Sequence, residues 1–292
     1  MIKKQRNIPL SILVLFVLFG ILFVYSMLAS VIYPVDLGKT DILSRLLPPS
    51  FIEGGKKEFF LGTDSLGRDF FIRLIYGTRN SLLISMSAMA IAMVIGTILG
   101  VLSGLYGGWV DWLISFLIDA RLSIPFLIIT IVLSSIFGSD KITMTLIMGF
   151  TGWATFARLI RGQIIQLKEQ NFIECSRSLG ASYVRILFEH ILVNISSILI
   201  VESTLRLSSF IILESSLSFL GLGIQPPDTS LGVLVSSGRD YLISDWWLSI
   251  IPSIIIIFIV LDISLVGDWL RDRLDPKLQT NREEKPKCHP FC

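Results

Sequence analysis

Charged residues are scarce in this chain of 292 residues. Asp, Glu, Lys and Arg together make up 16% of the sequence, whereas about 25% is usual in soluble domains. Hydrophobic residues make up 52%, and they gather in runs of the roughly 20 residues that a helix needs to cross a bilayer. The composition therefore excludes a soluble globular protein and predicts an all-α membrane protein with several spans.

Histidine and cysteine are also rare, with two and three residues respectively. The sequence contains no nucleophile–base set and no His-x-x-x-His pair. The Gly-Lys-Thr at residues 38–40 lacks the earlier glycine of a phosphate loop. We therefore expect a non-catalytic chain without a cofactor of its own. The net charge of +2 gives no reason to expect a nucleic-acid partner.

The tail at residues 277–292 is polar and holds the only closely spaced cysteine and histidine residues. Cys288, His289 and Cys292 could bind a metal ion, but three ligands do not complete a tetrahedral site. We expect solvated, reduced side chains there and no metal site.

Six apolar runs predict six transmembrane helices, at residues 10–33, 81–106, 112–137, 142–160, 191–221 and 247–268. The first run could instead be a cleaved signal peptide, but its apolar core exceeds the usual 7–15 residues, which favours a retained anchor. Proline and glycine residues mark 34–80 as an irregular loop. The expected organisation is an N-terminus and first span (1–33), an outer loop (34–80), a five-helix core (81–276) with a loop at 162–190, and the tail.

Glycine recurs every four residues in the second predicted span, at Gly96, Gly100, Gly104 and Gly108. One face of this helix therefore lacks side chains, which in lipid permits close packing on another helix. In the third predicted span, Asp119 and Arg121 lie about 200° apart around a helix and are not expected to pair with each other.

The fifth predicted span contains two polar features. Glu202 and Arg206 are four residues apart and can pair on one helix face. Glu214, Ser215 and Ser218 form a polar stripe suited to a water-accessible path, although hydrogen bonding between helices explains the serines almost as well.

Residues 171–192 separate two apolar runs and predict a short amphipathic helix. Asn171 is a good N-cap, with Glu174 placed for a capping box. Gly180 supplies the left-handed residue that ends the helix after about two turns. Such a short helix is marginal in water, so it needs a surface to pack against.

Four sequence blocks resemble permeases of ABC importers. Glu174-Cys175-Ser176, followed by Gly180 and Ile191-Leu192, resembles the family's EAA loop, with Cys175 and Ser176 in place of alanines and Val193 in place of a proline. Blocks at 61–79, 214–227 and 267–276 resemble the dipeptide, oligopeptide and nickel permeases. The resemblance covers residues 59–276.

The resemblance implies a type I ABC-importer permease fold of six transmembrane helices with a cytoplasmic coupling helix that docks on an ATPase. The implied coupling residues are Phe172, Ile173, Glu174, Cys175, Ser176, Leu179 and Gly180. In the outer segment, which we define as residues 61–79, Asp64, Arg68 and Asp69 are expected to form a charge network that pins the loop to the next helix. Direct contact with substrate is the alternative for these three.

The resemblance also implies partners. They are a homologous second permease, two ATPase subunits that bind ATP and Mg, and an extracytoplasmic substrate-binding protein. The chain itself is expected in the inner (cytoplasmic) membrane of a bacterial cell. The implied substrates are dipeptides or oligopeptides, with nickel, metal chelates or metallophores as the alternative. An ATP-independent secondary transporter is the alternative class. Lys and Arg number fourteen on the side of both termini and nine on the other, which favours cytoplasmic termini.

Overall fold

The computed structural model describes residues 10–171, 173, 176, 180, 185 and 187–274. Within these residues every regular element is a helix, and the only strand-like feature is an isolated bridge between Thr63 and Asp69. The all-α class predicted from composition is confirmed.

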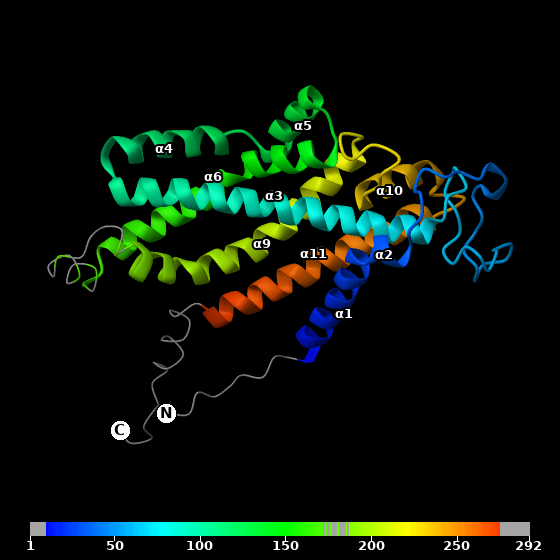
Figure 1. Cartoon of the computed structure of the whole chain (residues 1–292), viewed down its shortest axis with the longest axis horizontal. Helices are drawn as coiled ribbons and strands as arrows, with labels where there is room; N and C mark the ends of the chain where they lie inside the picture. The colour runs from blue at the N-terminus through cyan, green and yellow to red at the C-terminus, as the bar shows by residue number, and fades with distance from the viewer. Residues whose placement is uncertain are drawn as a thin grey trace, which may run out of the picture.

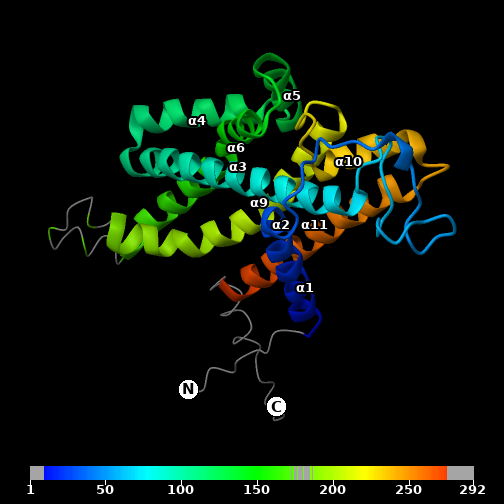
Figure 2. The same cartoon turned by 45° about the vertical axis from the view of Figure 1, so that its right-hand side comes forward.

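The helices in chain order are α1 (Leu10–Met27), α2 (Ala29–Ile32), η1 (Ile42–Ser44), α3 (Phe70–Tyr106), α4 (Gly108–Leu122), α5 (Phe126–Phe137), α6 (Lys141–Lys168), the π-helix η2 (Leu187–Ile191), α9 (Leu192–Phe219), α10 (Leu231–Gly238), η3 (Arg239–Tyr241) and α11 (Trp247–Leu274). Figure 1 shows α6 packed against α3, with α9 and α11 beneath them and α4 and α5 above. The turned view shows α1 crossing beside α11 (Figure 2).

Three helices are long and apolar enough to cross a membrane, namely α3, α9 and α11. The pair α4 and α5 adds a fourth span if it is counted as one broken element. Within the part of the chain described, α1 is apolar but shorter, and α6 has the length but a less apolar sequence. The structure therefore supports three or four of the six predicted spans, and the number six stays a prediction.

The second predicted span begins earlier than its apolar run at residue 81. Helix α3 starts at Phe70, because the Asp69 side chain caps it by accepting a hydrogen bond from the backbone N–H of Ile72 at 3.1 Å. Polar residues in the first turns of α3 made this segment resemble the preceding loop, but they are buried against other segments. Asn80, for example, donates to the carbonyl of Thr229 at 2.7 Å.

The third predicted span, 112–137, is not one straight helix. Helices α4 and α5 meet at 85°, and Pro125 stands immediately before α5. Proline has no N–H to donate and its ring clashes with the preceding turn, so a helix cannot run straight through it. Helix α4 begins at Gly108, so Gly107 alone separates it from α3.

Arg121 holds the corner between α4 and α5. Its Nε donates to the carbonyl of Thr151 in α6 at 2.6 Å, and a second nitrogen donates to the carbonyl of Ile124 at 3.1 Å. The guanidinium also lies 5.1 Å from the centre of the Phe126 ring. Asp119 pairs instead with Arg158 at 2.5 Å, so the prediction that Asp119 and Arg121 do not pair is confirmed.

Replacing Arg121 with methionine is expected to destabilise this corner, because the two carbonyls lose a charged donor. Two such hydrogen bonds are worth about 2 kcal/mol together, which corresponds to a fall of about 5 °C in the thermal midpoint of the detergent-purified protein. Arg239→Met is the control, since Arg239 is exposed and, among the described residues, pairs with its neighbour Asp240 alone. Equal midpoints for the two variants would contradict the role of Arg121.

The glycine face of α3 packs on α6 as predicted. A Cβ at Gly96 would meet Phe156, and one at Gly100 or Gly104 would meet Ile160 or Ile164. Gly108 is not part of this contact, because it opens α4 with a φ of 54° and has open space around it. The close approach of α3 and α6 forms the centre of the fold.

Candidate functional site

The structure describes only part of the predicted coupling stretch, by which we mean residues 172–180. Phe172, Glu174, Cys175 and Leu179 lie outside the described residues, as does the capping box of Glu174. Asn171, Ile173 and Ser176 are helical positions, and Gly180 is exposed with a φ of 83°. Gly180 thus has the left-handed conformation that the sequence predicted for the end of this helix.

Ile173 attaches the coupling stretch to the membrane helices. Its side chain is 1% exposed and belongs to a cluster with Ile160 and Ile164 of α6, Ile191 and Ile195. The side chain is therefore directed into the chain's own core. Ile173 therefore positions the stretch against α6 and the start of α9.

A polar cluster joins the ends of α3, α4 and α6 directly before the coupling stretch. Arg161 makes a bidentate ion pair with Asp111, at 2.5 and 2.8 Å, and the hydroxyl of Ser103 donates to the same carboxylate. The ammonium of Lys168 donates to the carbonyls of Gly104 and Leu105, at 3.1 and 3.0 Å, at the C-terminal end of α3. A displacement of the coupling stretch would therefore carry α3 and α4 along with α6.

The charge network of the outer segment has Asp64 at its centre. The Asp64 carboxylate accepts hydrogen bonds from Nε of Arg68 at 2.7 Å and from the backbone of Leu66 and Arg68. Nε of Arg73, in the first turn of α3, lies 3.4 Å from the same carboxylate. The predicted pinning of the loop to the next helix is present, and Arg73 is the member that sequence reasoning missed.

Asp69 does not join this network, because its carboxylate caps α3. Burial raises the pKa of Asp69, and hydrogen bonds from the N–H groups of Ile72 and Phe71 oppose that rise. Its role in the structure is therefore local to the helix start.

Glu214 lies in a fully buried polar cluster between α3, α9 and the start of α10. The carboxyl is 0% exposed and accepts hydrogen bonds from Ser218 at 2.8 Å and Ser215 at 3.4 Å. The hydroxyls of Ser81 and Ser230 also face it. Glu214 and Ser218 do not face water in this structure, unlike the predicted path, so their observed role is to join three helices.

Replacing Glu214 with alanine is expected to lower the thermal midpoint of the purified protein. The surrounding serine hydroxyls would lose their shared acceptor inside the protein, at a cost of about 2 kcal/mol or about 5 °C. Glu214→Gln keeps an acceptor and should recover most of the loss. Glu202→Ala is the matched control on the same helix, because Glu202 forms a more exposed pair with Arg206 at 2.6 Å. A midpoint for Glu214→Ala as high as that of this control would contradict the cluster's role.

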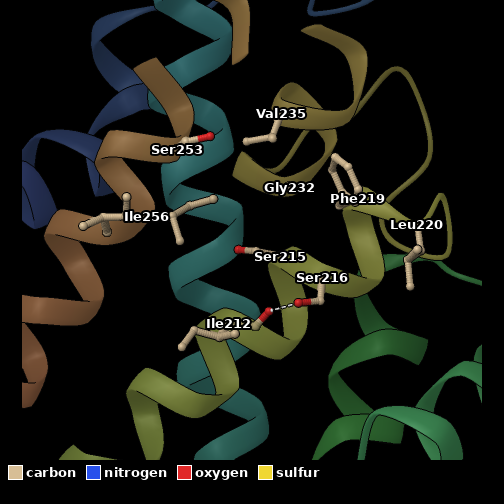
Figure 3. Close-up of a pocket in the computed structure, with 10 residues that line it drawn as sticks. Ile212, Ser215, Ser216, Phe219, Leu220, Gly232, Val235, Ser253 and Ile256 are labelled. Atoms are coloured by element: carbon tan, nitrogen blue, oxygen red, sulfur yellow. Dashed lines mark hydrogen bonds between the residues drawn. The ribbon is translucent and has the colours of Figure 1, made fainter. Parts of the chain in front are cut away.

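A groove of about 410 Å³ opens between α9, α10 and α11, near the Glu214 cluster. Figure 3 shows Ser215 and Ser216 on α9, Gly232 and Val235 on α10, and Ser253 and Ile256 on α11 around it. The remaining lining residues are Ile212, Phe219, Leu220 and Ile257. We call it the outer groove. Of the three predicted path residues, Ser215 alone lines it.

A second, larger cavity of about 630 Å³ lies between the last turns of α6, the first half of α9 and the end of α11. We call it the inner cavity. Its polar lining residues are Gln163, Gln166, Gln170, Asn194, Ser197, Glu202 and Arg271, and its apolar ones are Leu159, Leu167, Val193, Ile198, Val201 and Leu205. Sequence reasoning missed it because the glutamines are unremarkable until α6 and α9 are placed together.

The two hollows follow one face of α9. Ile198 and Leu205 line the inner cavity, and Ile212 and Phe219 line the outer groove. These residues are seven apart, so each points within about 20° of the previous one. Ser209, an exposed residue between the hollows, lies close to the same line. The residues of α9 that line the two hollows therefore lie on one side of the helix.

Comparison with solved structures agrees with this arrangement. The chain is similar to a chain of the solved MetNI methionine ABC transporter in its inward-facing conformations, with a TM-score of 0.57 and 19% sequence identity. The match covers 70% of this chain and 97% of the solved one. It shows a shared fold of the type I importer permeases, as the sequence resemblance implied.

The curated relatives are transport proteins of bacteria. The di/tripeptide transport system permease protein DppC of Pseudomonas aeruginosa is 38% identical, over 90% of this chain and 87% of the relative. The dipeptide transport system permease protein DppC of Haemophilus influenzae is 38% identical, over 90% of each chain. The oligopeptide transport system permease protein OppC of Bacillus subtilis is 36% identical, over 95% of this chain and 87% of the relative.

The sequence model of one family matches residues 96–280, which include the glycine face of α3, the coupling stretch and the whole of α9 and α11. That family is described as the inner membrane component of binding-protein-dependent transport systems. Its members are membrane components of transporters, as expected of a chain without catalytic motifs. With relatives matched along almost its whole length, this chain belongs to the family of binding-protein-dependent transport system inner membrane components.

Proposed function

We propose that this chain is one of two membrane subunits of an ATP-driven importer of dipeptides and oligopeptides. The observation that carries the proposal is its similarity, over about nine tenths of its length, to permeases of peptide transport systems. Import of nickel, metal chelates or metallophores is the alternative, and the contents of the partner binding protein distinguish the two. An ATP-independent transporter is the alternative class.

In this proposal the coupling stretch docks on a cytoplasmic ATPase subunit, and ATP and Mg bind to the two ATPase subunits. The residues proposed to meet the ATPase are those predicted from the sequence at 172–180. Two contacts support a rigid transmission. Ile173 is buried against α6 and α9, and Lys168 and Arg161 tie α6 to the ends of α3 and α4. Closure of the ATPases would thus move several helices as one body and alternate the side from which the path is open.

The proposed path follows the side of α9 that lines both hollows, with the second permease supplying the opposite wall. Ser215 would line its outer part, and the Glu214 cluster would hold α10 at its edge. Both termini and the coupling stretch would be cytoplasmic, in agreement with the distribution of Lys and Arg. The outer loop, residues 34–80, and its charge network would then face the extracytoplasmic binding protein.

The experiment is a pull-down of the tagged chain from its native membrane in mild detergent, with identification of the proteins that co-purify. We expect a second permease, two ATPase subunits and a binding protein, with peptides extracted from the binding protein. Metal chelates in that extract would favour the alternative substrate. A chain that purifies alone and transports in vesicles without ATP would contradict the proposal.

A further inference from the structure

The inner cavity has an unusual concentration of side-chain amides. Gln163 and Gln166 lie three residues apart on one face of α6, and Gln170 follows two residues after the last residue of that helix, Lys168. Asn194 and Ser197 lie across the cavity in the first turns of α9. Within the described part of the chain the three glutamine side chains have no hydrogen-bond partner. Their donors and acceptors are therefore available to a molecule in the cavity.

A lipid tail is a poor occupant for such a surface. Polar groups that face hydrocarbon without hydrogen-bond partners are costly, which is why they point into protein or into water-filled space within a membrane. The rim adds a charged residue, Arg271, at the end of α11. The lining thus favours water or a polar solute.

The lining matches the chemistry of a peptide backbone. A glutamine amide offers two N–H donors and a carbonyl acceptor, and a peptide bond presents one donor and one acceptor. Amides can therefore hold a backbone in a way that does not depend on its side chains. Arg271 has the charge and planar donor geometry that suit a terminal carboxylate.

The depth of the inner cavity also suits a short peptide. Its lining runs from Asn194 to Leu205 on α9, a rise of about 16 Å at 1.5 Å per residue. An extended peptide advances about 3.4 Å per residue, so about four or five residues fit along the cavity. Dipeptides and tripeptides are accommodated whole.

We infer that the inner cavity is a binding site for the backbone of a peptide in transit, with Gln163, Gln166 and Gln170 as its hydrogen-bonding residues. This inference rests on the proposed function and adds a site for the substrate within this chain. Recognition by amides of the main chain would let peptides of different sequence leave by one route, while the binding protein selects what enters.

The test uses the complete transporter in proteoliposomes with binding protein and a labelled tripeptide. The triple variant Gln163→Met, Gln166→Met, Gln170→Met keeps side-chain length and helix propensity but removes the amides. We expect peptide uptake to fall about tenfold while ATP hydrolysis stimulated by loaded binding protein stays within about twofold. The control triple is Ile142→Met, Leu146→Met, Ile165→Met, at exposed positions of the same helix, and should transport like the wild type. Wild-type uptake by the glutamine variant would overturn the inference.

A photo-crosslinking amino acid at Leu167, which lines the inner cavity, gives a direct readout. We expect an adduct with the labelled tripeptide that requires ATP and binding protein. An adduct with the second permease, or with lipid, in every nucleotide state would show another occupant and overturn the inference. If wild-type vesicles show no ATP-dependent uptake, the proposed function itself fails. If they do and the glutamine variant matches them, only the site is wrong.

Discussion

Replacing Gly180 with valine is expected to abolish peptide uptake while the subunits still assemble. Gly180 has a φ of 83°, and a Cβ there would meet no atom within 4 Å. The substitution therefore acts through the backbone, because a β-branched residue in the left-handed region costs about 1–3 kcal/mol. The chain would leave that conformation and displace the end of the coupling helix. In proteoliposomes we expect uptake at least about tenfold below wild type, and no stimulation of ATP hydrolysis by loaded binding protein.

Two variants isolate the cause. Gly221, just beyond the C-terminal end of α9, has a φ of 80° and equally open surroundings, so Gly221→Val applies the same strain far from the coupling stretch and should leave coupling intact. Gly180→Asn should recover most uptake, since asparagine tolerates the left-handed conformation. Normal uptake by an assembled Gly180→Val transporter would mean that the end of this helix does not set coupling.

Replacing Gly100 with leucine is expected to prevent stable folding. A Cβ at this position would lie 2.7 Å from the carbonyl oxygen of Ala157 and 2.8 Å from Cβ of Ile160. Both belong to α6, so α3 and α6 would have to separate along the centre of the fold. Overpacking of this kind costs about 3 kcal/mol, a large part of the 5–15 kcal/mol that typically stabilises a protein. We expect little folded protein in the membrane by fluorescence-detected size-exclusion chromatography.

Gly162→Leu is the matched control for Gly100→Leu. Gly162 is also a helical glycine, in α6, but a Cβ there meets no atom within 4 Å. The same change should therefore leave expression and the elution profile close to wild type, and helix propensity even favours it. Equal yields of folded protein from the two variants would show that the glycine face of α3 is not needed for close packing.

Features that depend on local geometry were predictable from the sequence. The four-residue glycine repeat indicated a bare helix face, and three of its members meet α6. Gly180 was expected to be left-handed because a two-turn helix needs an end there, and it is. Glu202 and Arg206, one turn apart, pair at 2.6 Å.

Features set by contacts between distant segments were not predictable. The apolar run at 112–137 gave no sign of an 85° bend, because hydropathy does not register the corner at Pro125. Helix α10 was not among the predicted helices, since eight residues with two glycines carry a weak pattern. Glu214 was expected on a path because polarity in a span indicates function, but its neighbours Ser81 and Ser230 come from elsewhere in the chain.

The ion pair of Asp111 with Arg161 was missed for the same reason, as its partners are fifty residues apart. Asp111 lies in the first turn of α4 and Arg161 near the end of α6, and only packing brings them together. The inner cavity was missed for the same reason, because its glutamines line a cavity only together with the residues of α9 opposite them. The sequence pattern thus predicted a coupling helix, while the structure was needed to see which helices are tied to the residues beside it.

The most direct test of the account is peptide uptake by the purified chain with its second permease, ATPase subunits and binding protein in proteoliposomes. We predict accumulation of labelled dipeptide or tripeptide that requires both ATP and the binding protein, and that is lost when the coupling stretch carries Gly180→Val. Uptake that proceeds without ATP, or a complete complex that hydrolyses ATP on addition of loaded binding protein yet moves no peptide, would contradict it.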